Sequence, residues 1–235
     1  MGVLGVDSHG INSPYEVCNK FRGVLIMNTS KNVNKLVKIS LLVAIAFILM
    51  LFEFPIPGFP PFLKLDLSDL PALIGGFALG PVAGVIIEGG KVILNLVFHG
   101  TYTGGVGEFA NFLIGGSFVF VASYVYHKNK TKKSAIIGLI LGTIIMTIVG
   151  AVFNYFILIP LYATIMGGMA NVIGASAAGN SNISSLTGII VLGITPFNII
   201  KGAIVSLITF VSYKKISPLL NRENVLAEQA MKKGA

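Results

Sequence analysis

Long apolar runs alternate with short polar breaks over most of this chain. The first run covers residues 39–52, and the preceding Val-Asn-Lys-Leu-Val-Lys segment can extend it as a helix. The later runs cover residues 67–98, 106–126, 134–165 and 188–213. Because about 20 apolar residues in a helix cross a bilayer, this pattern predicts an all-α integral membrane protein.

The run from residue 67 to residue 98 is too long for one ordinary span. As a single helix it would extend roughly 48 Å at about 1.5 Å per residue, whereas the hydrocarbon core is about 30 Å thick. Gly80-Pro81 lies near its middle, and a proline has no backbone N–H with which to continue a helix. We interpret the run as two short helices that turn at Gly80-Pro81, and a single long tilted helix is the alternative.

Fourteen of the 17 Lys and Arg residues form three clusters that lie outside the apolar runs, and only Lys64, Lys91 and Lys201 fall elsewhere. Five precede the first run, five close the chain, and four occupy one polar break at Lys128, Lys130, Lys132 and Lys133. Lys and Arg concentrate in cytoplasmic loops, so an even number of spans should separate each cluster from the next. This rule favours two crossings by residues 67–98 and predicts six transmembrane helices with both termini in the cytoplasm. The loops that then face outwards are 54–68, 99–105 and 166–187.

The composition agrees with a membrane protein. Apolar residues make up 54% of the chain, charged residues 11%, and the mean hydropathy is +0.85, far from the balance of a soluble domain. The net charge of +8 is therefore a signal of topology, because the basic residues flank apolar runs instead of alternating with aromatic residues as on a nucleic-acid-binding surface. The single cysteine, Cys18, excludes an internal disulfide.

The two ends of the chain differ from its apolar middle. Residues 1–26 are polar and contain no apolar stretch long enough for a signal peptide. We interpret residues 1–30 as a polar tail, which is a tag or a misassigned start if the functional chain begins near Met27. Residues 31–215 then form the membrane domain, and residues 216–235 form a short cytoplasmic tail.

Sequence motifs of common enzymes are absent. The chain has no Gly-x-x-x-x-Gly-Lys-Ser/Thr motif to hold ATP phosphates and no His-Glu-x-x-His motif. Its three histidines, His9, His99 and His127, are scattered and have no cluster of carboxylates around them, which argues against a metal site. The sequence therefore indicates a protein that binds or moves a molecule, not an enzyme.

Several polar side chains interrupt the apolar runs, and such groups at membrane depth tend to mark ligand or ion pathways. Glu88 and Lys91 are three residues apart on one helix, which favours a local ion pair. Glu108 and Asn111 share a helix face in the same way and are candidates for a cavity wall or for helix capping and interhelical hydrogen bonds. The remaining candidates are Asn95, Asn154, Asn198 and Lys201.

The spacing of Asn198 and Lys201 places an amide and an ammonium group side by side on one helix. Asn154 lies in the outer half of the preceding span with Tyr155 beside it. The predicted topology puts these side chains towards the outer leaflet. We expect them to line a cavity for a flat, mostly apolar ligand with polar edges, and a purely structural network between helices is the alternative.

Five segments resemble a known family. They are Phe62-Leu-Lys-Leu-Asp-Leu-Ser-Asp69, the following LPALIGGFALGP, and then TGGVGEFANFLIG, FNYFILIPLY and PFNIIKG. As a set, and in this order, they resemble the riboflavin-specific S components of energy-coupling-factor (ECF) transporters, and the likeness covers roughly residues 31–215.

The resemblance implies a protein of the prokaryotic plasma membrane that captures riboflavin from outside. A membrane-embedded T component and two cytoplasmic ATPases would then drive its release inwards, and riboflavin would be the transported ligand, with no cofactor. Asn154, Asn198 and Lys201 match flavin contacts of the family, and the loop with Leu63 and Lys64 matches the cover of the site. Glu108 and Asn111 are carried over from their motif. Because riboflavin is neutral, we expect Lys201 to act as a hydrogen-bond donor.

Two features depart from the family. S components commonly dock on their scaffold through Ala-x-x-x-Ala on the first helix, and the best match here is Ser40-x-x-x-Ala44, which would still allow close packing. The outer loop at 166–187 is long, and we interpret it as a solvated linker, with a lid as the alternative.

Three other functions remain open at this point. An S component for folate, thiamine or another vitamin would have the same fold. A stand-alone proton-coupled carrier would use Glu88 or Glu108 as its titrating group. A structural membrane protein would bind no ligand.

Overall fold

The computed structural model describes residues 33–101 and 103–212 of the chain. It divides into two units, Met1–Lys38 and Ile39–Ala235. The described residues of the first unit, 33–38, are helical, and the architecture below is that of the second unit. The tails expected at 1–30 and 216–235, including Met27, lie outside the described residues.

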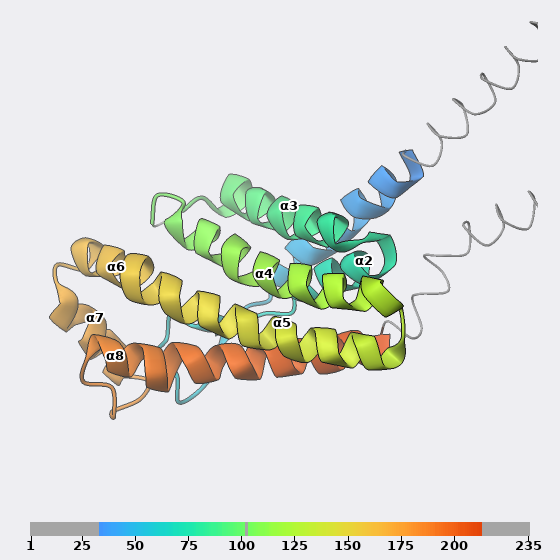
Figure 1. The fold of residues 1–235 in the computed structure, drawn as a ribbon. Coiled ribbons are helices and arrows are strands. Elements are labelled where there is room, and N and C mark those ends of the chain that lie inside the picture. The colour runs from blue at the N-terminus through green and yellow to red at the C-terminus, as the bar shows by residue number, and fades with distance from the viewer. Residues whose placement is uncertain (1–32, 102, 213–235) are drawn as a thin grey trace, which may run out of the picture. The chain divides into compact units, whose positions relative to one another are not determined.

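The second unit consists almost entirely of helices, with one small hairpin (Figure 1). The first helix is Val33–Met50, most of which belongs to this unit. The hairpin strands are β1 (Phe54–Pro55) and β2 (Lys64–Leu65), which pair antiparallel. The labelled helices that follow are α2 (Asp69–Leu79), α3 (Pro81–His99), α4 (Val106–Asn129), α5 (Lys132–Phe153), η1 (Asn154–Leu158), α6 (Ile159–Ile165), α7 (Met169–Ala177), α8 (Leu186–Gly188) and η2 (Ile189–Ile194).

Two of the long helices contain a π-helical turn. η1 joins α5 to α6 within the helix Lys132–Ile165, and η2 lies within the last helix, Leu186–Ser212. The last helix runs beside α5 (Figure 1), and the hydroxyls of Thr143 and Ser206 lie 3.5 Å apart between the two. Such π turns often occur at functional sites, and Asn154 is the first residue of η1.

Five helices of the described chain are long and apolar enough to cross a membrane. They are Val33–Met50, Pro81–His99, Val106–Asn129, Lys132–Ile165 and Leu186–Ser212. Large apolar side chains on these helices point outwards, and Phe98, Val97 and Phe156 are each 70% exposed. Such a surface is stable in lipid, so this is a multi-pass membrane protein.

The helix break predicted at Gly80-Pro81 is confirmed. α2 ends at Leu79 and α3 begins at Pro81, and Gly80 between them has a φ of 110°. A side chain would be strained at this φ, so glycine permits the turn. α2 has 11 residues and is about 16 Å long, which is half of the hydrocarbon core. The number of crossings and the side of each terminus therefore stay predictions.

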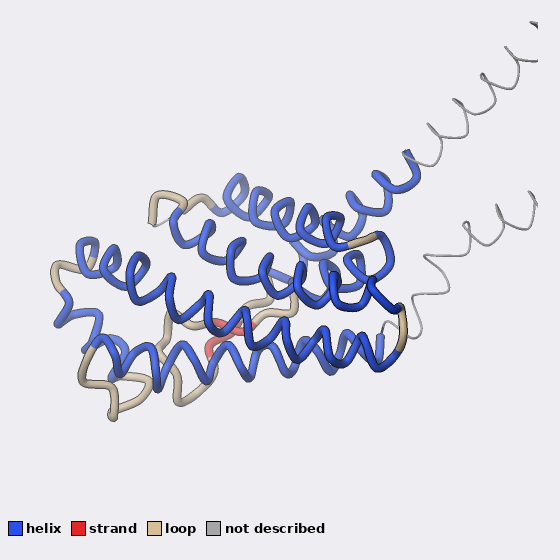
Figure 2. The backbone as a smooth tube through the Cα atoms, in the orientation of Figure 1, coloured by secondary structure: helices blue, strands red, loops and turns tan. Residues whose placement is uncertain are grey.

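The α4–α5 turn follows from local sequence. Lys130 ends α4 in the left-handed region, with a φ of 48°. Thr131 then caps α5, because its side-chain oxygen accepts a hydrogen bond from the backbone N–H of Ser134 at 3.1 Å. α4 and α5 then approach closely at Gly138, where an added Cβ would lie 2.5 Å from the Ala122 carbonyl oxygen. Figure 2 shows the two helices packed side by side.

The segment after α6 is packed and is not a solvated linker. It contains α7, and its side chains Val172 and Ile183 are fully buried in one apolar cluster with Phe62 and Leu63. These two residues belong to the loop 54–68, which we call the first outer loop after the side that the sequence predicts for it. A Cβ at Gly179 would collide with the carbonyl oxygen of Phe59. The interpretation of residues 166–187 as a linker is therefore wrong, because this segment buries apolar side chains against the loop that follows the first helix.

Candidate functional site

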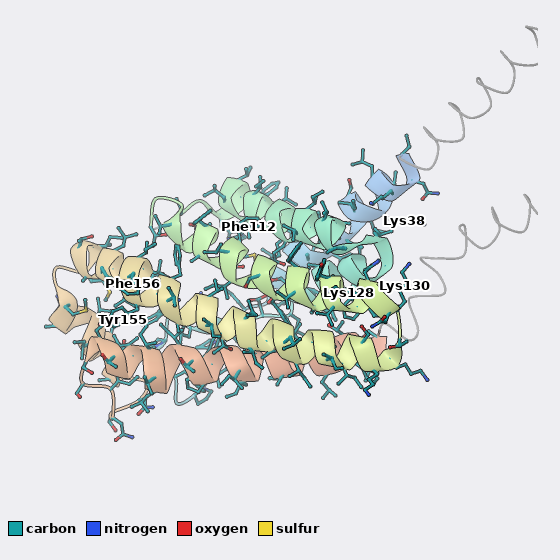
Figure 3. All side chains as sticks on the ribbon, in the orientation of Figure 1. Lys38, Phe112, Lys128, Lys130, Tyr155 and Phe156 are labelled. Atoms are coloured by element: carbon teal, nitrogen blue, oxygen red, sulfur yellow. The ribbon has the colours of Figure 1, made fainter. Side chains whose placement is uncertain are left out.

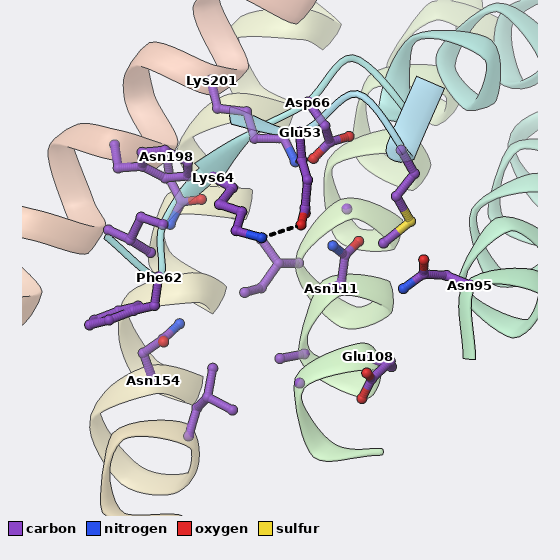
Figure 4. Close-up of a pocket in the computed structure, with 18 of the residues that line it drawn as sticks. Glu53, Phe62, Lys64, Asp66, Asn95, Glu108, Asn111, Asn154, Asn198 and Lys201 are labelled. Carbon is purple, nitrogen blue, oxygen red and sulfur yellow. Dashed lines mark hydrogen bonds and ion pairs between the residues drawn. The ribbon is translucent and has the colours of Figure 1, made fainter. Parts of the chain in front are cut away.

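A cavity of about 470 Å³ lies between the first outer loop, α3, α4, η1 and the last helix. Its volume falls within the range of about 300–1,000 Å³ that small-molecule sites usually have. The wall combines apolar side chains such as Phe62, Leu158 and Phe197 with several amides and charged groups. Figure 4 shows that the polar side chains converge on this space from different elements.

The structure brings seven of the eight predicted site residues to this cavity. They are Leu63, Lys64, Glu108, Asn111, Asn154, Asn198 and Lys201. Two come from the first outer loop, two from α4, one from η1 and two from the last helix. Their contact with a ligand stays a prediction.

Tyr155 does not line the cavity, so the expectation for this residue is wrong. Its side chain is 39% exposed, and its ring packs edge-on against Phe156 at 4.9 Å between centroids. Figure 3 shows both rings on the outside of the helix. Successive helical residues point about 100° apart, so the inward direction of Asn154, which is 4% exposed, turns Tyr155 towards the membrane.

Three amides of the wall are free to bind a ligand. Among the described residues, the side chains of Asn95, Asn111 and Asn198 form no hydrogen bond to another residue. Asn154 is partly engaged, because its Nδ2 donates to the Gly150 carbonyl oxygen at 2.8 Å. Each amide presents a donor and an acceptor, so these groups can match a ligand edge that also carries both.

Lys201, which we expected to act as a hydrogen-bond donor, is itself held by two carboxylates. Its Nζ lies 3.0 Å from Asp66 Oδ2 and 3.3 Å from Asp69 Oδ2, with only 12% of the lysine side chain exposed. Asp66 is held further by the backbone N–H of Ser68, which donates to its Oδ1 at 2.8 Å. Burial alone would raise the pKa of the Asp66 carboxyl, but the ammonium groups of Lys201 and Lys91 and the hydrogen bond from Ser68 together hold that pKa below its ordinary value.

Behind the cavity, Lys91 joins the start of α2 to α3. Its Nζ donates to Asp69 Oδ1 and, at 2.6 Å, to Ser68 Oγ, and it lies 2.6 Å from Glu88 Oε1. The local ion pair predicted between Glu88 and Lys91 is therefore confirmed. The side chains of Asp69, Glu88 and Lys91 are at most 1% exposed.

Asp69 connects the two lysines, since its Oδ1 contacts Lys91 and its Oδ2 faces Lys201. We call Asp66, Asp69, Glu88, Lys91 and Lys201 together the buried charge network. Ionised groups are buried at low cost only when they are paired. The network therefore fixes Lys201 and the end of the first outer loop relative to α2 and α3.

A second, more exposed ion pair lies in the hairpin at the cavity. Lys64 donates to Glu53 Oε1, and the two side chains are 46% and 40% exposed. Figure 4 marks this pair with a dashed line. Ion pairs of this exposure contribute little to the stability of the fold. The pair is of interest because both of its side chains line the cavity.

Sequence reasoning assigned no role to Asp66, Asp69 or Glu53. Carboxylates in a loop or in the first turn of a helix usually cap the helix or face solvent. Their positions in the sequence therefore did not indicate that they belong to the site. The two lysines were the available clue. Lys91 and Lys201 lie in apolar helices, so each requires a carboxylate as counter-charge. One carboxylate, Glu88, was close in sequence, and the other two came from a loop that sequence alone could not place.

The comparisons with known proteins agree on one family. The model for "ECF transporter, substrate-specific component" matches residues 34–213. The riboflavin transporter RibU of Staphylococcus aureus (strain TCH60) is 43% identical over 196 residues, which cover 83% of this chain and 96% of that protein. The riboflavin transporter FmnP of Bacillus subtilis (strain 168) is 35% identical over 192 residues, covering 81% and 96% of the two chains.

A solved structure supports the same relationship. It is the S component of a bacterial ECF transporter, and it is 41% identical to this chain with a TM-score of 0.63. The match covers 80% of this chain and 98% of the solved one. The overall backbone is therefore shared along with the sequence.

Proposed function

This chain belongs to the family of substrate-specific components of ECF transporters, and we propose that it binds riboflavin in the cavity described above. The two relatives named above are riboflavin transporters, and the match covers 96% of the length of each. The chain is accordingly a riboflavin transporter component and not an enzyme, as the resemblance of its motifs implied.

The observation that carries the site proposal is the set of polar groups on an otherwise apolar wall. Riboflavin has a flat ring whose imide edge carries one N–H donor between two carbonyl acceptors, and a side chain of hydroxyl groups. Asn111, Asn154 and Asn198 offer donors and acceptors from three different helices. Phe62 and Phe197 offer aromatic faces to the ring.

Lys201 contributes within the buried charge network. Its ammonium has three N–H donors, so pairing with Asp66 and Asp69 leaves it able to donate to a ligand carbonyl as well. The first outer loop carries Leu63, Lys64 and Asp66 on the same wall. A ligand that engages Lys201 is therefore also covered by this loop.

Transport would depend on partners in the membrane. We propose that the chain crosses the prokaryotic plasma membrane six times with both termini inside, and that α2 and the preceding loop complete one crossing. An ECF module of a T component and two cytoplasmic ATPases would drive release. Ser40 and Ala44 are exposed on one face of the first helix, which is consistent with their proposed role in docking the scaffold.

The test is a fluorescence titration of the detergent-solubilised protein, freed of flavin, with riboflavin. We expect quenching that saturates at one riboflavin per chain, with no response to thiamine or folate. A response to one of those vitamins and not to riboflavin would contradict the assignment of the ligand. Uptake by the chain alone that collapses with the proton gradient would instead support a stand-alone carrier that titrates Glu88 or Glu108.

A further inference from the structure

The turn between α4 and α5 concentrates positive charge outside the cavity. Its lysines are Lys128, Lys130, Lys132 and Lys133, and we call these four residues the basic turn. All four side chains are exposed, and none of them lines the cavity. Figure 3 shows Lys128 and Lys130 where α4 passes into α5.

The carboxylates of the described chain lie elsewhere. They are Glu53, Asp66, Asp69, Glu88 and Glu108; four of them line the cavity, and Glu88 contacts Lys91. Glu108 is the acidic residue of α4, and roughly 30 Å of helix separate it from Lys128. Within residues 33–101 and 103–212, no lysine of the basic turn forms an ion pair.

The first turn of α5 makes this clustering of charge costly. Lys132 and Lys133 are its first two residues, and the turn contains no acidic residue. The N-terminus of a helix carries a partial positive charge, so it favours anions and disfavours cations. The neighbouring ammonium groups also repel one another. An anion bound at the basic turn would relieve both costs.

An aromatic and apolar surface adjoins the basic turn. Phe120 and Tyr124 on α4 are 44% and 48% exposed, and their rings stack at 5.9 Å between centroids. Lys128 Nζ lies 4.9 Å from the centroid of the Tyr124 ring. On α5, Ile136 and Ile140 are exposed. Tyrosines, and lysines whose stems pack on apolar groups, are typical of the boundary between the bilayer and water.

We propose that the basic turn binds the anionic headgroups of membrane phospholipids, with their acyl chains lying against the exposed face of Phe120 and Tyr124. Both helices that meet at this turn are long and apolar enough to cross a membrane, so the turn lies at the level of the headgroups. Clusters of lysine next to a span attract anionic lipids. A phospholipid matches the charge of the turn and the apolar surface beside it together. The proposal does not rest on the proposed function.

The test compares two lipids that differ only in the headgroup. The detergent-solubilised protein is titrated with phosphatidylglycerol, which is anionic, or with phosphatidylcholine of the same acyl chains, which has no net charge. Native mass spectrometry counts the lipids retained by each chain, and thermal unfolding gives the midpoint. The wild type should retain phosphatidylglycerol in preference and should be stabilised more by it.

Two triple variants separate charge from packing. Lys128→Gln/Lys132→Gln/Lys133→Gln removes three charges and leaves Lys130, which closes α4 in the left-handed region, unchanged. Each lysine near an anionic surface strengthens association by about fivefold, so this variant should bind phosphatidylglycerol at least about tenfold more weakly. Replacement of the same three lysines by arginine keeps the charge and should keep the affinity.

Measurements without anionic lipid give the opposite order of stability. In detergent alone the glutamine variant should be at least as stable as the wild type, because repulsion between like charges is removed. A less stable glutamine variant under this condition would mean that the lysines hold another part of the protein, and it would overturn the proposal. Riboflavin titration of the variant checks its fold, and Lys132→Gln/Lys133→Gln is the milder substitute if the triple variant does not fold.

Two further measurements need no variant. Raising the ionic strength from about 0.05 M to about 0.5 M should weaken the retention of phosphatidylglycerol by the wild type. Inorganic phosphate at the same concentration as the lipid should stabilise the wild type less than phosphatidylglycerol does, because it cannot contact the apolar surface. Equal stabilisation by phosphate would contradict a lipid as the occupant.

The outcomes keep this proposal apart from the riboflavin site. Equal retention of the two lipids by the wild type, or equal retention of phosphatidylglycerol by the wild type and the glutamine variant, would overturn the lipid-binding surface and leave the riboflavin site standing. Failure of the wild type to bind riboflavin would overturn the proposed function and leave the preference for the anionic lipid as evidence for this surface.

Discussion

Lys201 Nζ lies 3.0 Å from Asp66 Oδ2, although 135 residues separate them in the sequence. The contact joins the last helix to the first outer loop across the wall of the cavity. The same lysine also faces Asp69 at 3.3 Å, so Asp66 can be removed without leaving the ammonium group unpaired. This arrangement makes Asp66 a suitable position at which to test how the loop is held.

We expect Asp66→Asn to weaken riboflavin binding by about tenfold or more. The substitution keeps the shape of the side chain but removes a charge-assisted hydrogen bond, which is typically worth about 1.5–3 kcal/mol. The loop that carries Leu63 and Lys64 then loses its ion pair with the last helix and is held there only by packing, such as that of Phe59 on Phe197. Fluorescence quenching gives the affinity, and stopped-flow dissociation should show that the ligand leaves faster.

Glu53→Gln is the matched control for Asp66→Asn. It removes a carboxylate from the same loop, but from an ion pair in which both side chains are about half exposed, and such pairs contribute about 1 kcal/mol or less. We expect a change of less than about fivefold. Equal losses in the two variants would contradict the claim that the Asp66–Lys201 contact anchors the loop.

The Asp66–Lys201 contact should be insensitive to pH over the physiological range. The pKa of Asp66 lies below its ordinary value in the folded protein, so the unfolded chain binds the proton more tightly. The stabilisation is therefore fully present above the unfolded pKa, which is about 3.9, and is lost as the pH falls through the lower folded pKa.

We accordingly expect the difference in thermal stability between the wild type and Asp66→Asn to stay constant from about pH 5 to about pH 8. It should shrink only below about pH 4. Thermal unfolding in detergent at a series of pH values measures this difference. A difference that disappears between pH 5 and pH 7 would mean that another group, and not Asp66, carries the effect.

The Lys91 side chain should be essential for stability. Lys91→Met removes the ammonium group that, among the described residues, alone contacts both Glu88 and Asp69. An uncompensated buried charge typically costs about 3–5 kcal/mol. We expect a large fall in the thermal midpoint. Glu88 would be affected most, since its Oε2 already lacks a hydrogen-bond partner among the described residues.

The double variant Lys91→Met/Glu88→Gln tests the cause of this loss. Removing both charges of the pair leaves Asp69 with Lys201, so the double variant should be more stable than Lys91→Met alone by at least about 1 kcal/mol. If the double variant is the less stable of the two, then Lys91 stabilises the fold by packing and not by compensating charge.

The sequence predicted the helices well because each depends on local features. Apolar length defined the spans, and Gly80-Pro81 marked the break that the structure shows. Asn198 and Lys201 were found because polar side chains in apolar helices are costly. Asp66 and Asp69 were missed as site residues because their role depends on lysines 22 to 135 residues away, and no local pattern reports such a distance.

The structure also differs from the sequence-based predictions at Tyr155 and in the segment 166–187, and both differences have physical reasons. Tyr155 was assigned to the cavity from its adjacency to Asn154, but neighbouring residues of a helical turn point in different directions. The segment 166–187 was interpreted as a solvated linker because it is long for this family. Its apolar residues, among them Val172 and Ile183, nevertheless pack against the first outer loop.

The adjacent residues Asn154 and Tyr155 should respond differently to alanine substitution. Asn154→Ala removes a buried amide from the cavity wall and should weaken riboflavin binding by about tenfold to a hundredfold, since one lost buried partner costs about 1–3 kcal/mol. Tyr155→Ala removes a ring that faces outwards and should leave the affinity within about threefold. Riboflavin titrations of both variants measure these affinities. A loss of affinity greater than about threefold in Tyr155→Ala would mean that Tyr155 does contribute to the site.

Gly150 should position Asn198, because a Cβ at this glycine would lie 2.7 Å from Asn198 Nδ2. We expect Gly150→Ala to displace the amide and to weaken riboflavin binding by about tenfold. Gly174→Ala in α7 is the matched control, because nothing lies within 4 Å of its added Cβ. Alanine favours a helix over glycine by roughly 0.5–1 kcal/mol, so the control should keep its affinity and gain slightly in thermal stability.

The combination Gly150→Ala/Asn198→Ala then separates the two explanations for a loss of riboflavin affinity in Gly150→Ala. If Gly150 acts through the amide, the double variant should bind no more weakly than Asn198→Ala alone, whereas additive losses would mean that Gly150→Ala disturbs the packing of α5 against the last helix.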